Sequence, residues 1–238
     1  MTALVQESDK AAAQAKAIQI LTDADTSEVI EYLAGQKSAV EVAEIYHAMM
    51  KDAYWKRKRL DHTIILARAG IHQSIVSALP QQQEDPETAA RLLGIAKAIN
   101  YDLASFTWVG WDEPGIEIST IDAAIGMDAA RANLRFAMEL EKGDLAVFRA
   151  YWMLGAHLLT AGDRVAAGAA FASAARHAAT AETETGVMLS RGFAILATAP
   201  QQERERELEP IIEKLSTLEQ GPGYIDQIKT AIRVLYRV

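Results

Sequence analysis

Apolar residues recur along the chain at spacings of three and four, and polar or charged residues fill the positions between them. Such a period places apolar side chains on one face of a helix, and alanine, leucine, glutamate, lysine and arginine, which dominate the chain, are good helix formers. Runs of alternating β-branched residues, which would indicate strands, are few. The pattern predicts an all-α fold.

Breaks in the pattern divide the first part of the chain into several helices. The polar residues 22–27 separate the first two, and Thr26 or Ser27 is expected to cap the helix that begins near Glu28. Gly35 is expected to mark the next break.

Glycine and proline mark the next boundaries. Gly70 is expected to interrupt a helical run and Pro80 to end it, because proline lacks the N–H that a helix interior needs. Asp85 can then cap a helix whose first position is Pro86 and which reaches about Phe106.

The stretch SFTWVGWDEPGIE, residues 105–117, is expected to end that helix. Gly110 lets the backbone leave helical dihedral angles, and Pro114 cannot donate within a helix. Residues 119–122, STID, have the spacing of a capping box that starts the next helix. The stretch therefore predicts a turn between two helices.

Two interpretations of the side chains in this turn stay open. Trp108 and Trp111 can cover the ends of adjoining helices, while Asp112 and Glu113 precede a helix start, where negative charge is favoured. Alternatively, these side chains form an aromatic and acidic lip that receives a basic partner, since binding residues often lie on loops.

Further helices are expected near residues 119–142, 145–161, 164–181, 183–197, 203–218 and 224–236. The links between them are short, which favours antiparallel neighbours. We divide the chain into an amino-terminal helical region, residues 1–80, and a second region, residues 81–238, and expect the two to be continuous as one domain.

The segment 148–181 carries the most informative spacing in the chain. Matched to the pattern W-x2-L-G-x2-Y, A-x3-F and A, it supplies Tyr151, Leu154, Gly155, Leu158, Ala167, Phe171 and Ala174. A Gly-Asp pair stands at the turn between the two helices. The segment resembles a tetratricopeptide repeat, although tyrosine and leucine replace the family's tryptophan and tyrosine, and Ala179 stands where the family has a closing proline.

The resemblance implies a concave surface, formed by the first helix of each pair, that holds a peptide or a partner helix. By position, the side chains facing this groove would be Arg149, Trp152, Met153, Ala156, Leu159 and Thr160. The family's clamp for a terminal carboxylate uses lysine and asparagine, which are missing here, so an apolar anchor on Trp152 and Met153 is expected instead. Packing of Trp152 on the preceding helix is the alternative.

A single repeat cannot bury both of its faces, so we expect antiparallel helical hairpins stacked as a tetratricopeptide-like α-solenoid. The last helix places Ile225, Ile228, Ile232 and Leu235 on one stripe, as in an amphipathic capping helix. A seam between two copies of the chain is the other interpretation of this stripe.

Composition narrows the setting. The chain of 238 residues is 50% hydrophobic, has no cysteine and shows no run resembling a secretory signal or a membrane span, so a cytoplasmic protein with no membrane association is expected. The net charge of −8 disfavours nucleic acid, and the basic run WKRKRL, residues 55–60, is interpreted as a solvated helix face.

Signals of catalysis are weak. No two of the five histidines have the four-residue spacing that presents a helical metal pair, and no nucleotide or hydrolase motif occurs, so neither a metal nor a cofactor is predicted. We expect a non-catalytic interaction module. The alternative is a helical enzyme or small-molecule sensor with a pocket formed by Tyr46, His47, Tyr54, Trp55, Asp61 and His62.

Overall fold

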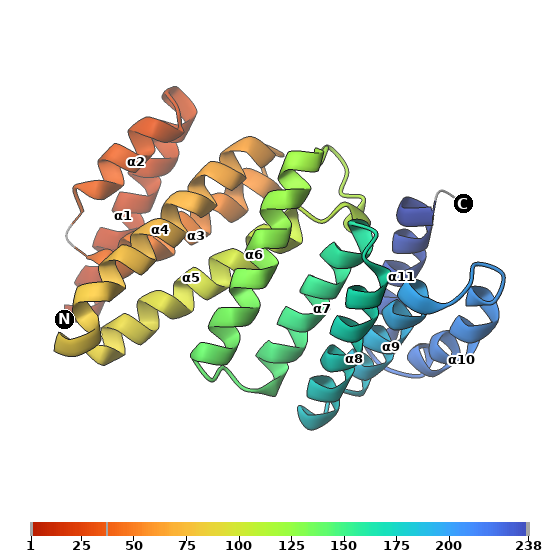
Figure 1. Cartoon of the computed structure of the whole chain (residues 1–238). Coiled ribbons are helices and arrows are strands. Elements are labelled where there is room, and N and C mark those ends of the chain that lie inside the picture. Colours follow the sequence, from red (N-terminus) through yellow and green to blue (C-terminus); the bar gives the residue numbers. More distant parts are fainter. Residues whose placement is uncertain (1, 37, 237–238) are drawn as a thin grey trace. The chain divides into compact units, whose positions relative to one another are not determined.

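A computed structural model describes residues 2–36 and 38–236. The fold is all-α: the described residues form eleven α-helices and one short 3-10 helix, with no strand, and consecutive helices pack against each other (Figure 1). The all-α prediction is therefore confirmed.

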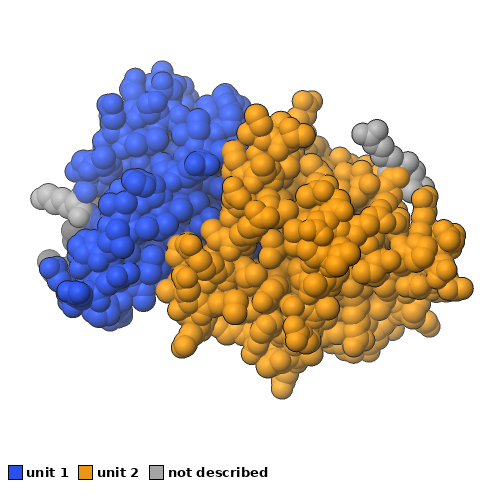
Figure 2. All heavy atoms as spheres, in the orientation of Figure 1, with its two compact units in different colours: residues 1–106 blue, residues 107–238 orange. Residues whose placement is uncertain are grey.

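The chain forms two compact units, residues 1–106 and 107–238 (Figure 2). Unit 1 contains α1 (Thr2–Asp23), α2 (Thr26–Ala34), α3 (Ala39–Trp55), α4 (Leu60–Glu84) and α5 (Pro86–Phe106). Unit 2 contains η1 (Val109–Trp111), α6 (Thr120–Glu139), α7 (Asp144–Thr160), α8 (Arg164–Thr180), α9 (Glu184–Thr198), α10 (Arg204–Ser216) and α11 (Gly221–Tyr236). Residue 80 lies inside α4, which packs along α5. The division into residues 1–80 and 81–238 concerns regions that fold independently, so it stays a prediction.

Two expected breaks in unit 1 lie inside α4. A Cβ atom on Gly70 would come within 2.7 Å of the Tyr46 Cβ and 3.0 Å of Ile99 Cδ1, so this glycine allows close packing with α3 and α5. Pro80 deprives the Val76 carbonyl of its helical donor, yet the helix continues to Glu84 and ends with the Asp85 N–H bonded to the Gln81 carbonyl. The predictions that these two residues interrupt and end the helix were wrong.

The helix starts largely follow their polar residues. Ser119 and Asp122 form the expected capping box of α6, and Asp85 accepts a hydrogen bond from the Thr88 N–H at the start of α5. At α2 the cap is Asp25, rather than Thr26 or Ser27, because its carboxylate accepts from both the Ser27 and the Glu28 N–H.

The α7–α8 hairpin shows why the repeat-like spacing packs. A Cβ atom on Gly155 would lie 2.8 Å from the Phe171 ring, so the glycine lets the ring lie directly on α7. Gly162 turns the chain at a φ of +83°, and the Asp163 side chain caps α8 by accepting from the Ala166 N–H. Tyr151 stacks on His177 with 5.6 Å between the ring centroids.

Candidate functional site

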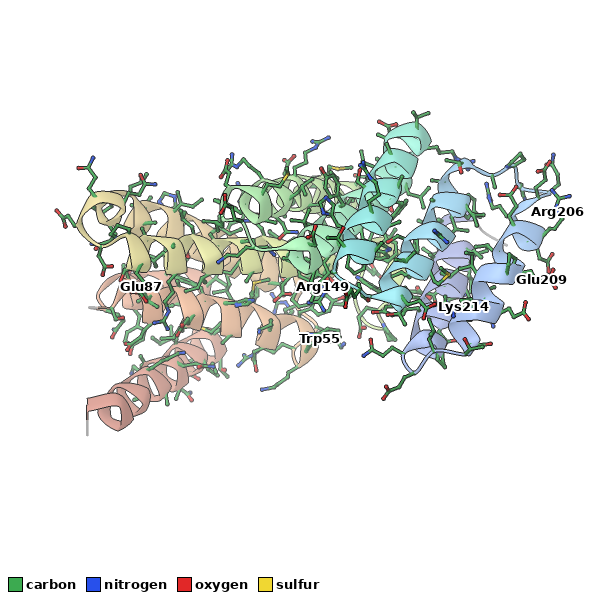
Figure 3. The ribbon with its side chains drawn as sticks, turned by 90° about the horizontal axis from the view of Figure 1, so that it is seen from below. Trp55, Glu87, Arg149, Arg206, Glu209 and Lys214 are labelled. Atoms are coloured by element: carbon green, nitrogen blue, oxygen red, sulfur yellow. The ribbon has the colours of Figure 1, made fainter. Side chains whose placement is uncertain are left out.

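The six residues expected to line the groove lie along α7. Trp152, Met153, Ala156 and Leu159 are buried, with 4%, 0%, 0% and 7% of their surface exposed. Thr160 is half-buried, and Arg149 is exposed and projects from α7 (Figure 3). Most of this face is therefore already covered by the chain itself.

Residues 107–112, here called the tryptophan segment, cover the centre of this face. The Trp108 indole N–H donates to the Ala156 carbonyl at 3.1 Å and to Thr160 Oγ1 at 3.0 Å. The Trp108 ring meets Trp152 edge to face at 5.5 Å and lies 6.0 Å from the Phe193 ring of α9. An internal peptide thus occupies the place where the resemblance puts a ligand.

Helix α11 packs against α9 and against η1, which is part of the tryptophan segment. Its Ile228 lies where a Cβ atom on Gly192 would come within 2.9 Å, and the Tyr236 hydroxyl donates to the Leu196 carbonyl. Arg233 of α11 also forms an ion pair with Asp112 of the tryptophan segment. The apolar stripe of α11 is therefore used mainly inside its own chain.

These contacts bear on the two interpretations of Trp152. The side chain packs within the chain, against Trp108 and Phe193, and its buried indole nitrogen has no hydrogen-bond partner among the described residues. With 4% of its surface exposed, Trp152 offers a partner little contact area in this conformation. The expectation that structural packing explains Trp108 and Trp111 fits these contacts, whereas Asp112 is paired internally.

The residues of the alternative pocket belong to α3 and α4 of unit 1 and make several different contacts. Tyr46 is buried against Gly70, and burial raises its pKa to about 12. His47 pairs with Asp102 of α5 at 2.7 Å. The Arg59 guanidinium bonds both Asp61 and His62, and its hydrogen bonds to Asp61 lower the pKa of that carboxyl to about 2. The described contacts do not gather these groups around one reacting atom.

Tyr54 and Trp55 form a third location, at the end of α3. The Tyr54 ring is buried and stacks on Phe106 at 4.0 Å, while Trp55 stands edge-on to both rings and is 54% exposed (Figure 3). The ammonium of Lys58 lies 5.5 Å from the Trp55 ring centroid. This is an aromatic and cationic helix end at which Tyr54 is buried and Trp55 is more than half exposed.

The basic run forms the turn from α3 to α4, so its solvated cations lie on a turn and not on the helix that the sequence indicated. Lys58 has a φ of +53°, which breaks the helix. Lys56 and Arg57 both pair with Asp52; burial of Asp52 raises the pKa of its carboxyl, but the hydrogen bonds from these two cations outweigh burial and lower it. Arg59 pairs with Asp61. Neighbouring carboxylates thus offset much of the charge that a phosphate would need.

A surface that the sequence analysis missed runs along α4. Ile65, Val76 and Leu79 are 42%, 48% and 59% exposed, His72 is exposed and Ala69 is half-buried. Together Ile65, Ala69, His72, Val76 and Leu79, here called the α4 stripe, follow one another at spacings of four, three, four and three. That order is the seam spacing of helices that pair as coiled coils.

The signal for this surface was present in the sequence. The opposite face of α4 is buried and carries Ile64, Ala67, Ser74 and Ala78, so the helix is apolar on two sides. A helix that must cover only one core needs one apolar stripe, and a second stripe at heptad spacing indicates a second packing partner.

Within the described ranges, no helix is long and apolar enough to cross a membrane. The same residues contain no group of three or more histidine, cysteine, aspartate or glutamate side chains placed to hold a metal ion. Comparison of the chain with protein-family models, curated proteins and solved structures finds no match, so its similarity to tetratricopeptide repeats rests on the spacing and packing of its own residues.

Proposed function

We propose that this protein is a non-catalytic interaction module that binds an amphipathic helix of a partner protein. The exposed α4 stripe is the observation that carries the proposal. From Ile65 to Leu79 it covers about 21 Å of helix, at a rise of 1.5 Å per residue. A partner helix with apolar residues at matching spacing would insert them between these side chains.

The charges beside the stripe favour a different protein over a second copy of this chain. Arg68 flanks the stripe, is exposed and makes no ion pair with any described residue. Two copies packed antiparallel about His72 would bring two imidazoles together and would give Arg68 no carboxylate. An acidic residue on a partner helix would complement Arg68, and such rim charges set orientation and association rate.

The tetratricopeptide-like arrangement of unit 2 is part of the same proposal. It is supported by the glycine-mediated packing of α7 on α8 and by a similar approach at Gly168 of α8, where a Cβ atom would lie 2.8 Å from the Thr198 side chain. We propose that these hairpins form a short helical solenoid whose concave face the tryptophan segment closes, leaving unit 1 to bind the partner. A cytoplasmic location, expected from the lack of cysteine, fits this role.

Photo-crosslinking with a matched control position tests the proposal. A benzophenone amino acid placed at His72, within the stripe, is compared with one at Glu87, an exposed residue of α5 (Figure 3). We expect a protein that crosslinks from residue 72 and not from residue 87. The partner is then purified and its affinity measured by calorimetry.

Charge variants complete the test. Val76→Glu with Leu79→Glu should weaken the partner's affinity at least tenfold, while Gln82→Glu with Ala90→Glu, which adds the same charge off the stripe, should leave it unchanged. Circular dichroism verifies that both variants fold. Crosslinks between copies of this chain would show that the stripe mediates self-assembly and does not bind a partner helix. A partner whose affinity is unchanged by both variants would refute the role of the stripe.

A further inference from the structure

Unit 2 contains a pocket beside the tryptophan segment. Its volume is about 510 Å³, and it lies among the start of α6, the end of α7 and the chain between η1 and α6. α6 and α7 lie side by side (Figure 1). The volume falls within the usual range for small-molecule sites, which is about 300–1,000 Å³.

Most of the wall is apolar. It is formed by Val109, Ile118, Ala123, Ala124, Met127 and Ala161. The short alanine side chains leave space beside α6, and the flexible side chain of Met127 can adapt to a ligand. Such a wall suits the aliphatic part of a ligand.

Several of the polar groups in the wall are already engaged. Thr160 Oγ1 accepts from Trp108 and donates to the Ala156 carbonyl, so it is held by the fold. The Ser119 hydroxyl bonds Asp122 in the capping box. Their capacity for a ligand is therefore reduced.

The charged lining has one sign. Arg131 lines the pocket and has only a long contact, 3.4 Å, to Asp128, while no aspartate or glutamate belongs to the wall. His157 is 2% exposed and also lines the pocket. Gly126 lets the His157 ring and the Thr107 side chain approach α6, because a Cβ atom at residue 126 would overlap both. Arg131 therefore gives the wall a local positive charge in a chain whose net charge is −8.

We propose that this pocket binds an aliphatic monocarboxylate, with the carboxylate on Arg131 and the chain on the alanine and methionine wall of α6. One guanidinium matches one carboxylate in charge and in its forked donor geometry. The apolar wall leaves few donors for the several oxygens of a phosphate. The site is independent of the α4 stripe, which lies in unit 1.

Calorimetry with decanoate and with decanol, its uncharged match, tests the site on the full chain. Decanoate should bind with a Kd on the order of 0.1 mM, in line with the ligand efficiencies of small apolar ligands. Decanol should bind less tightly. Arg131→Gln should weaken decanoate about fivefold, the effect of an exposed ion pair, and leave decanol unchanged.

Three further variants locate the binding. Ala124→Trp fills the pocket from an exposed position and should abolish binding of both probes, while Arg135→Gln, one turn along α6 and outside the wall, should change neither. The double variant Val76→Glu with Leu79→Glu should also bind decanoate normally, which separates this site from the α4 stripe. Equal binding of the two probes, or binding that survives Ala124→Trp in a folded protein, would overturn the proposal, as would the absence of decanoate binding.

Discussion

Trp108 meets Trp152 edge to face, with 5.5 Å between the ring centroids and 82° between the ring planes. Trp108 is 1% exposed and Trp152 is 4% exposed, so the pair forms part of the core of unit 2. The turn between α5 and α6 is thus held by its own aromatic side chains, which pack on the face of α7 that was expected to hold a ligand.

Replacing Trp108 should destabilise unit 2 strongly. We expect Trp108→Ala to lower the free energy of unfolding by about 3–5 kcal/mol, as for other buried aromatic side chains. Trp108→Phe should cost less, since it keeps most of the ring and loses the two indole hydrogen bonds. Urea unfolding followed by circular dichroism measures both, with Trp55→Ala as an exposed control that should cost about 1 kcal/mol or less. Similar losses for Trp108→Ala and Trp55→Ala would contradict the packing described.

Gly155 should tolerate no side chain. In Gly155→Ala the new Cβ atom would lie 2.8–3.0 Å from three atoms of the Phe171 ring, which is fully buried and cannot swing away. We expect a loss of about 1–3 kcal/mol in the free energy of unfolding, the usual cost of overpacking. Gly223→Ala is the matched control: apart from its chain neighbours and the nearby backbone of α11, no described atom lies within 4 Å of its Cβ position, so stability should stay the same or rise by about 1 kcal/mol. Equal effects would show that the hairpin yields.

Glu44 should make the stability of unit 1 depend on acid pH. Burial raises the pKa of its carboxyl, but hydrogen bonds from Lys10 and Arg91 outweigh burial and lower it. Because the folded-state pKa is below the unfolded value of about 4.3, the stabilisation is present above that value and is lost as the pH falls through the folded-state pKa.

Thermal unfolding of Glu44→Gln at a series of pH values measures this effect. At pH 7 we expect a loss of about 1 kcal/mol or less, because Arg91 is mostly exposed and its pairing is screened. The difference from the unaltered protein should disappear below the folded-state pKa. A constant difference for Glu44→Gln from pH 7 to pH 3 would argue against the two ion pairs.

Substitution by glutamate should affect the free energy of unfolding very differently at two adjacent residues of α4. Leu79 is 59% exposed, so Leu79→Glu should change the free energy of unfolding by no more than about 0.5 kcal/mol. Ala78 is fully buried beside Ala43 and Leu92, so Ala78→Glu should cost about 3 kcal/mol or more by burying an unpaired charge. Calorimetric melting of the two variants checks this. If Leu79→Glu also unfolds unit 1, the α4 stripe is structural.

The sequence predicted features that depend on near neighbours. The capping box of Ser119 and Asp122 and the cap supplied by Asp85 involve partners three residues away, so their spacing alone identifies them. The preference of α2 for Asp25 over Thr26 and Ser27 was missed because all three residues can cap, and only the backbone geometry selects one.

Features set by distant partners were beyond the sequence. The resemblance to a tetratricopeptide repeat placed Trp152 on a groove-lining face of α7, but no nearby residue indicated that Trp108, on the turn before α6, would pack against it. On α4, Ile64 and Ile65 are adjacent and chemically identical, yet one is 8% exposed and the other 42%. Which of two apolar stripes is buried depends on the neighbouring helices, and hydrophobic period does not encode that choice.

The position of the tryptophan segment in the chain also sets the order in which unit 2 can be completed during synthesis. Arg233 and Asp112, which pair, are 121 residues apart, whereas α7 and α8 pair across a short turn. The hairpins can therefore form early, from local contacts. Trp108 can pack only after α7 and α9 have been synthesised, and Asp112 can pair with Arg233 only after α11 has been synthesised. Until α11 has left the ribosome, the nascent unit exposes apolar surface, so its yield in cells should depend on how quickly residues 221–236 are translated.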